Sequence, residues 1–194
     1  AGRAAAVYVC GPSGIGKSAL VDCFLDRVLA REPAIVLSGR CYENESVPYK
    51  ALDGVVDSLS HYLTSLPAAS VEALIPADIA TLARLFPVLM RVDAVASAPR
   101  PQHNSDPLLV RSRALDALRE LLTRLGRLQP VEIAIDDLQS ADADSAVLLE
   151  ELLRPPGAPP LLMLACFRTE EMPAKPFLRA LLQGSGGAAP LPLA

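Results

Sequence analysis

The chain has 194 residues, 51% of them hydrophobic and 21% charged, and its net charge at neutral pH is −4. This composition excludes an intrinsically disordered chain, and the acidic balance disfavours a direct nucleic-acid interface, which needs clustered cations. Every apolar run is much shorter than the roughly 18 residues that suggest a membrane span. No basic leader with an apolar core precedes the first apolar run, so we expect a cytoplasmic protein, with no membrane partner, whose residues 1–194 form one domain.

A phosphate-binding loop motif lies near the start of the chain. The segment Gly11-Pro12-Ser13-Gly14-Ile15-Gly16-Lys17-Ser18 fits the pattern G-x-x-x-x-G-K-[ST]. The apolar run before it, residues 4–10, predicts a buried strand, and residues 19–25 after it predict a helix. A glycine-rich turn is the alternative interpretation, but the strand and helix on either side favour a loop that binds phosphate.

The residue types of this loop suit the phosphates of a nucleotide. Glycines let the backbone approach a ligand and turn successive N–H groups inward, and the following helix adds the positive end of its dipole. Lys17 is a mobile cation that can reach the β- and γ-phosphates, and the Ser18 hydroxyl can ligate Mg²⁺. The residues that we expect to contact the nucleotide are Gly11, Pro12, Ser13, Gly14, Ile15, Gly16, Lys17, Ser18 and Ala19.

The next elements favour a parallel sheet covered by helices. A helix is expected over residues 17–31, and residues 34–37 form an apolar run ended by Ser-Gly. Runs that are apolar on both faces are typical of parallel strands between helices. A polar connection, residues 40–49, leads to a helix of about residues 49–63, and such loops line the ligand crevice of parallel sheets. The residues thereby expected near the nucleotide are Arg40, Tyr42, Glu43 and Glu45.

Residues 66–107 contain six prolines, which interrupt longer elements. We expect a helical, partly mobile insertion with short helices such as residues 79–86 and a mobile link over about residues 96–105. Asp106 predicts a helix N-cap with Pro107 at the first helical position, and this helix should run to about residue 126. Its arginines suit a solvated helix face, which we favour, or a surface for a partner. They are Arg111, Arg113, Arg119, Arg124 and Arg127.

Two consecutive carboxylates end the next predicted strand, residues 131–137. Acids at this end of a parallel strand lie beside the phosphate loop, because both belong to the carboxyl edge of one sheet. Asp136 is placed to hold Mg²⁺ opposite Ser18. Asp137 is placed to accept a proton from, or orient, the water that attacks the γ-phosphate. A helix-capping acid at a strand end is the alternative, and the phosphate loop disfavours it.

An arginine follows the next buried strand. Residues 143–153 predict a helix, and residues 161–167 predict a strand followed at once by Arg168. At this sheet edge Arg168 would contact the γ-phosphate or stabilise charge in the transition state, while an ordinary surface arginine is the alternative. The remaining expected elements are a helix over residues 176–183, a glycine-rich turn over residues 184–187 and a strand over residues 189–193.

The four cysteines are scattered along the chain without a C-x-x-C pair. Their spacing favours neither a zinc site nor a disulfide framework, so we expect buried, reduced thiols. They are Cys10, Cys23, Cys41 and Cys166.

Three further segments, taken together, carry a family resemblance. They are Gly39-Arg40-Cys41-Tyr42, Ile135-Asp136-Asp137-Leu138-Gln139 and Ala165-Cys166-Phe167-Arg168-Thr169-Glu170. With the phosphate loop, they are similar to the AAA-type ATPase domains of the STAND class, which occur in bacterial multidomain signalling and transcription regulators. The resemblance implies a P-loop α/β/α sandwich whose five-stranded parallel sheet has the order 5-1-4-3-2. It also implies that two of the cysteines, Cys10 and Cys166, fall on neighbouring strands.

The resemblance implies a role for each site residue. The phosphate loop would be the Walker A motif, Asp136 and Asp137 the Walker B pair, and Arg168 the sensor arginine. Lys17, Asp137 and Arg168 are then the expected catalytic residues, and Ser18 and Asp136 the expected ligands of Mg²⁺. The family's upstream Gly-Arg-Glu element and downstream winged-helix or helical module lie outside these residues, so we expect the core of a larger protein.

These inferences predict an ATP-binding and slowly hydrolysing regulatory switch. Adenine is favoured by the resemblance and by the lack of the [NT]-K-x-D signature of guanine recognition. The expected partners are ATP or ADP, other domains of the full-length chain and, in a nucleotide-dependent way, further copies of the chain. A nucleotide-gated interaction module without turnover is the alternative. A small-molecule P-loop kinase is less favoured, because residues 66–107 offer few arginines for a lid: Arg84, Arg91 and Arg100.

Overall fold

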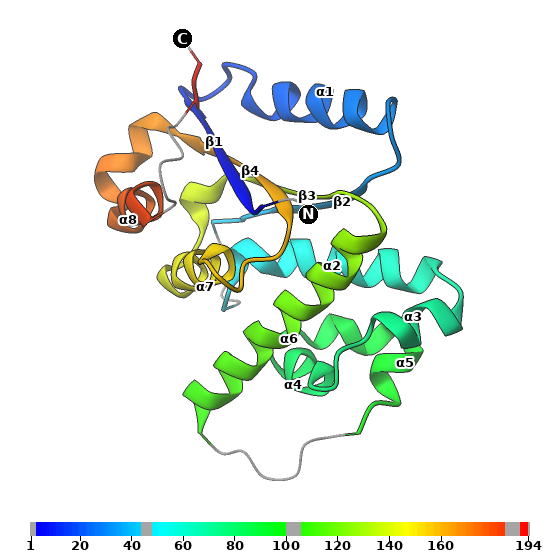
Figure 1. The fold of residues 1–194 in the computed structure, drawn as a ribbon. Coiled ribbons are helices and arrows are strands. Elements are labelled where there is room, and N and C mark those ends of the chain that lie inside the picture. The colour runs from blue at the N-terminus through cyan, green and yellow to red at the C-terminus, as the bar shows by residue number, and fades with distance from the viewer. Residues whose placement is uncertain (1–2, 44–47, 100–105, 185–190, 194) are drawn as a thin grey trace.

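The computed structural model describes residues 3–43, 48–99, 106–184 and 191–193 (Figure 1). These residues contain a five-stranded sheet in the order β2-β3-β4-β1-β5, with every adjacent pair parallel. The order, counted from the other edge, is the predicted 5-1-4-3-2 arrangement, so the fold class is confirmed. The strands are β1 (Ala5–Gly11), β2 (Ile35–Arg40), β3 (Val131–Asp136), β4 (Leu161–Arg168) and β5 (Leu191–Pro192).

Helices cover both faces of the sheet, as Figure 1 shows. One face carries α1 (Lys17–Leu29), and the other carries α2 (Lys50–Ser65), α6 (Pro107–Leu128) and α7 (Ala143–Leu153), with α8 (Pro176–Gly184) packed beside α7. Strand residues alternate between two apolar clusters, as a period of two requires. Ile133 and Ile135 belong to the large cluster on the α2, α6 and α7 side, whereas Ala134 belongs to the small cluster under α1.

The proline-rich part of the chain folds into short helices on the far side of α2 and α6 from the sheet (Figure 1). They are α3 (Ala68–Leu74), α4 (Ile79–Leu85), the 3₁₀ helix η1 (Pro87–Arg91) and α5 (Asp93–Ala96). Their apolar side chains join the main core, and Leu82, Phe86 and Leu89 are almost completely buried. The predicted mobile link, about residues 96–105, starts at the last residue of α5. Most of the link, residues 100–105, lies outside the described residues.

The end of β2 differs from the sequence prediction. We expected this strand to stop before the Ser38-Gly39 pair, but it continues to Arg40, which pairs in register with Asp136. Gly39 permits a close approach of α2, since a Cβ atom at this position would lie 2.7 Å from the backbone nitrogen of Val55. The glycine therefore marks helix packing rather than a strand end, and the longer strand carries Arg40 to the sheet edge.

The start of α6 is as predicted, because the Asp106 carboxylate accepts a hydrogen bond from the Leu108 N–H at 2.9 Å, with Pro107 at the first position. One expectation about cysteines is wrong. Three of the thiols are buried, but Cys23 lies exposed on α1. Cys10 and Cys166 do lie on the neighbouring strands β1 and β4.

Two other expectations concern the last part of the chain, which the structure describes only in part. Of the predicted glycine-rich turn, residues 185–187 lie outside the described residues, as do residues 189–190 of the last predicted strand. None of the helices in the described residues combines the length and the apolar character that crossing a bilayer requires.

Candidate functional site

The predicted site residues lie at the ends of four strands, along one edge of the sheet. Gly11 at the end of β1 is in register with Arg168 at the end of β4, and Arg40 at the end of β2 is in register with Asp136 at the end of β3. A cleft of about 280 Å³ lies at this edge. It is lined by Ser13, Gly14, Gly16, Lys17, Ser18, Ala19, Arg40, Asp136, Asp137 and Arg168.

The phosphate loop owes its shape to its glycines. Gly14 and Gly16 have φ values of +79° and +99°, in the left-handed region that other residues rarely adopt. Gly11 has a different requirement, because a Cβ atom there would lie 2.9 Å from the Leu193 carbonyl oxygen next to β5. Ile15 is exposed in the loop, 41% of its surface being accessible. The loop ends at the first turn of α1, where free N–H groups and the helix dipole favour an anion.

Lys17 is held inside this loop. Its side chain is largely buried, and Nζ donates hydrogen bonds to the carbonyl oxygens of Gly11 at 2.9 Å and Pro12 at 2.8 Å. These two residues therefore contribute to the site through their backbone. A buried ammonium group needs such partners. The two bonds hold the Lys17 ammonium beside the first residues of the loop, so the cleft that Lys17 lines carries a positive charge there.

Ser18 and Asp136 form the candidate cation site. Ser18 Oγ donates a hydrogen bond to Asp136 Oδ2 at 2.9 Å, although the two residues are 118 positions apart. Hydroxyl and carboxylate oxygens are ligands that Mg²⁺ accepts, and Mg²⁺ often keeps water between itself and a carboxylate. The donor set therefore fits Mg²⁺, which would lie between two groups that now bond to each other.

Asp137 is engaged on both carboxylate oxygens. Arg40 donates to Oδ2 from Nη2 at 2.6 Å and from Nε at 2.9 Å, and Gln139 donates to Oδ1 at 2.8 Å. Arg168 Nε lies 3.7 Å from Oδ1. Partial burial raises the pKa of Asp137, but the bonds from Gln139 and Arg40 and the charges of both arginines lower that pKa below its usual range overall. The carboxylate is therefore a firmly ionised, weak base.

Gln139 is a site residue to which sequence reasoning assigned no role. It is buried in the 3₁₀ helix η2 (Leu138–Ser140), with 4% of its surface exposed. Its Nε2 binds Asp137, and its Oε1 accepts the backbone N–H of Arg168 at 3.1 Å. One amide side chain thus links the acid after β3 to the arginine at the end of β4, and only the fold brings them together.

The residues predicted near the nucleotide at the end of β2 and after it lie in different places. Arg40 belongs to the cleft, and its guanidinium also lies 5.9 Å from the ring centroid of Tyr42, which is 54% exposed. Glu43 lines a smaller hollow of about 150 Å³, which shares Arg40, Asp137 and Arg168 with the cleft. Glu45 lies outside the described residues.

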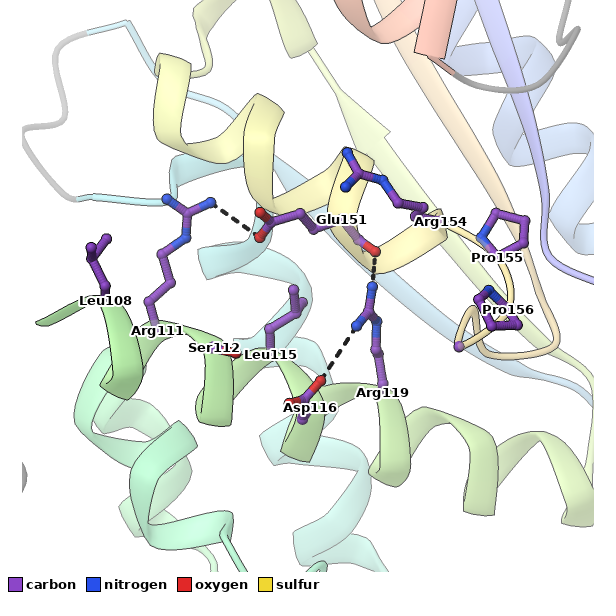
Figure 2. A pocket seen from close by; sticks show the side chains of 11 residues that line it. Leu108, Arg111, Ser112, Leu115, Asp116, Arg119, Glu151, Arg154, Pro155 and Pro156 are labelled. Atoms are coloured by element: carbon purple, nitrogen blue, oxygen red, sulfur yellow. Dashed lines mark hydrogen bonds and ion pairs between the residues drawn. The ribbon is translucent and has the colours of Figure 1, made fainter.

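A larger hollow of about 440 Å³ lies between α6 and α7, remote from the phosphate loop (Figure 2). Arg111 donates to the Glu151 carboxylate at 3.2 Å, and Arg119 donates to the Glu151 backbone oxygen and to Asp116. Both arginines are only 22% exposed. Their charges connect the two helices, so we attribute this hollow to the packing of α6 against α7.

The α6 arginines therefore correct the expectation of a uniformly solvated face. Besides Arg111 and Arg119, Arg124 donates to backbone oxygens at the end of α3, with its shortest bond, 2.7 Å, to Ile75. Arg113 and Arg127 are exposed. Helical periodicity placed these arginines opposite the apolar stripe, but it did not reveal that α3 and α7 flank that stripe.

Comparison with known proteins adds a family and two solved structures. Residues 1–164 match the family model of the AAA ATPase domain. A chain of the Drosophila ORC structure bound to GC-rich DNA and Cdc6 is 14% identical, with a TM-score of 0.46, covering 100% of this chain and 50% of that one. A chain of the Drosophila ORC structure bound to AT-rich DNA and Cdc6 is 14% identical, with a TM-score of 0.45 and coverages of 94% and 45%. The chain thus spans about half the length of these solved chains, and no curated protein sequence matches it significantly.

Proposed function

Because the chain belongs to the AAA ATPase domain family, we propose that it binds ATP with Mg²⁺, hydrolyses it slowly and acts as a regulatory switch in a multidomain signalling protein. One observation carries this proposal. The carboxylate that would assist hydrolysis, Asp137, lies in the same cleft as the phosphate loop, and both its oxygens are already hydrogen-bonded. A carboxylate that is already engaged in this way supports slow rather than rapid turnover.

Each cleft residue has a role in this proposal. Lys17 would exchange its two carbonyl partners for the β- and γ-phosphate oxygens. Ser18 and Asp136 would hold Mg²⁺, which supplies charge neutralisation when it is bound with the nucleotide. Asp137 would orient the attacking water, and Arg168 would stabilise the negative charge that develops on the transferred phosphoryl group. These roles match the residue types and their shared cleft.

Slow turnover suits a switch, because the bound nucleotide carries information for as long as hydrolysis takes. The network from Arg40 through Asp137 and Gln139 to Arg168 supports this role, since it joins three strand ends and would respond to the terminal phosphate. The partners in this proposal are other domains of the full-length chain and, in a nucleotide-dependent assembly, further copies of the chain. Two discrete arrangements of such a network are what a switch requires.

Phosphate release under multiple turnover tests the proposal. Wild-type protein should release more than one phosphate per molecule from Mg-ATP. Lys17→Ala should lose most of its ATP affinity, while Asp137→Asn should bind ATP and lose turnover. Asp26→Asn, the same change at an exposed carboxylate on α1, is the matched control. Equal turnover in Asp137→Asn and wild type would contradict the role of Asp137.

The engaged carboxylate also favours one alternative, a nucleotide-gated interaction module without useful catalysis. In that case ATP would bind with Lys17-dependent affinity, but phosphate release would not exceed one molecule per site in any variant. Binding and turnover measured on the same preparation separate the two functions.

A further inference from the structure

A carboxylate accepts a hydrogen bond from the first backbone N–H of the phosphate loop. The Ser13 N–H donates to Glu170 Oε1 at 3.0 Å, across 157 positions of the chain. Pro12 has no N–H, so the Ser13 amide is the first donor that the loop offers after β1. The sheet register explains the contact. Gly11 and Arg168 are register partners, and Ser13 and Glu170 each lie two residues beyond them.

Glu170 holds a negative charge at this position. Its own backbone N–H, the Ser13 N–H and the charges of Lys17 and Arg168 lower the pKa of this exposed carboxyl below its usual range. Glu170 is the second residue of the 3₁₀ helix η3 (Thr169–Ala174), which directly follows the strand that carries Arg168. An anion that binds the loop therefore meets a fixed negative charge as well as the cations of the site.

The contact lies at the end of the loop where the terminal phosphate belongs. Lys17, which reaches the β- and γ-phosphates in such sites, is bonded to Gly11 and Pro12, immediately before Ser13. Arg168 is two residues from Glu170 and 3.7 Å from Asp137. By contrast, the first turn of α1, which cradles the inner phosphates, begins at the other end of the loop.

We propose that Glu170 sets the preference of this site between nucleoside di- and triphosphates. Its carboxylate competes with the terminal phosphate for the Ser13 N–H and repels it, whereas a diphosphate leaves this contact in place. The inference rests on the proposed function, because it requires that the loop binds nucleotide. Glu170 is then a specificity-determining residue, because it weakens the binding of ATP relative to that of ADP. The hydrogen bond between Ser13 and Glu170 must break before ATP binds fully.

Two substitutions separate charge from hydrogen bonding. Glu170→Gln keeps an oxygen that can accept from Ser13 and removes the charge, while Glu170→Ala removes both. We expect Glu170→Gln to tighten binding of a non-hydrolysable ATP analogue by about threefold to tenfold, the effect of one unit charge near a solvated phosphate. ADP affinity should change by less than about twofold, and Glu170→Ala should give an equal or larger effect. The gain should shrink as salt is added.

The measurement is calorimetric titration of the 194-residue chain with Mg-ADP and with the Mg-bound ATP analogue, at low and high salt. Glu72→Gln, at an exposed position on α3, makes the same charge change away from the cleft and should leave both affinities unchanged. An ATP-to-ADP affinity ratio that is the same in Glu170→Gln and wild type, or that moves toward ADP, would overturn this inference and leave the proposed function standing. Wild-type protein that binds neither nucleotide would overturn the proposed function, and the inference with it.

Discussion

The guanidinium of Arg40 and the carboxylate of Asp137 form an ion pair with 2.6 Å between Nη2 and Oδ2. Arg40 is the last residue of β2, and Asp137 follows β3 directly, with a left-handed backbone conformation of φ +52°. Such a conformation is uncommon outside glycine and turns the chain sharply at the site. The pair therefore fixes the direction of a carboxylate whose backbone already departs from the strand.

Removing Arg40 should change how Asp137 titrates. In Arg40→Ala the carboxylate loses two hydrogen bonds and a nearby charge, so its pKa should rise toward the ordinary value of an aspartate. In the proposed function hydrolysis needs Asp137 to be ionised, so the acid limb of the pH profile of kcat should move to higher pH. Because both pKa values lie at or below the ordinary value of an aspartate, about 3.9, the profile should be measured between about pH 2.5 and pH 6.

The control for this prediction is Arg91→Ala. Arg91 pairs with Asp57 at 2.9 Å in an exposed ion pair far from the cleft, so its loss should leave the acid limb unmoved. An acid limb that stays in place in Arg40→Ala would show that Arg40 does not govern the ionisation of Asp137.

Gln139 should act as a positioning residue. Gln139→Ala leaves Asp137 Oδ1 and the Arg168 N–H without their buried partner. We expect kcat to fall by about tenfold to a hundredfold, because small displacements of groups around the reacting phosphate are costly. ATP affinity should change little, since Gln139 does not line the phosphate loop cleft. Single-turnover rates and ATP binding constants, measured on the same variant, check that kcat falls while the affinity stays the same.

Gln129→Ala is the matched control, at the end of α6 on the opposite edge of the sheet. A second variant, Gln139→Glu, keeps the acceptor for Arg168 but places a negative charge against Asp137. Its kcat should also fall. If Gln139→Ala loses ATP affinity and unfolding stability but keeps kcat, the residue is structural only.

The parts of the site that could be predicted are those encoded in local sequence. The strand, glycine loop and lysine at 11–18 form one continuous motif, and two acids after an apolar run indicate a strand end at the same edge. The position of Arg40 near the nucleotide could also be predicted, from its place after a strand, and Arg40 does line the cleft. Its pairing with Asp137 and the contacts of Gln139 and Glu170 could not be predicted in this way. Their contacts depend on which strands are neighbours and in what register, as the Gly11 to Arg168 pairing illustrates.

The glycine at the end of β2 offers a test of packing. In Gly39→Ala, the new methyl group would meet backbone atoms of α2, the nearest at 2.7 Å, and backbone cannot yield as a side chain can. We expect a loss of about 1–3 kcal/mol in the free energy of unfolding, the usual cost of overpacking. ATP turnover should fall as well, because a strand that is displaced at position 39 also displaces the next residue, Arg40, from Asp137.

Gly157→Ala serves as the control for Gly39→Ala. A Cβ atom at position 157 would come no closer than 4.0 Å to a neighbouring side chain, and its backbone is not left-handed. Its unfolding free energy should stay within about 0.5 kcal/mol of wild type. Equal urea midpoints for the two variants would contradict the close approach of α2 to β2.

Replacing Glu132, a buried acid in β3, with glutamine should stabilise the fold. This residue of β3 is only 6% exposed, lies between Val36 and Leu162 in the sheet register, and its Oε2 has no hydrogen-bond partner in the described structure. Burial, followed by the charge of Glu32, raises its pKa. A carboxyl with a raised pKa in the folded state favours folding below its unfolded pKa, and that contribution is lost as the pH rises through the folded value. At pH 7 the folded protein therefore carries the cost of a buried carboxylate without a hydrogen-bond partner on Oε2. Glu132→Gln removes this cost, so it should raise the free energy of unfolding at pH 7 by roughly 1 kcal/mol.

The gain from Glu132→Gln should shrink as the pH falls below the ordinary pKa of a glutamate, where the wild-type carboxyl is protonated in both states. Urea unfolding at about pH 4 and pH 8 measures this difference. Glu72→Gln, exposed on α3, should show no such pH-dependent gain. A Glu132→Gln protein that is less stable than wild type at pH 8 would contradict this prediction, because the ionised carboxylate would then stabilise the folded state instead of destabilising it.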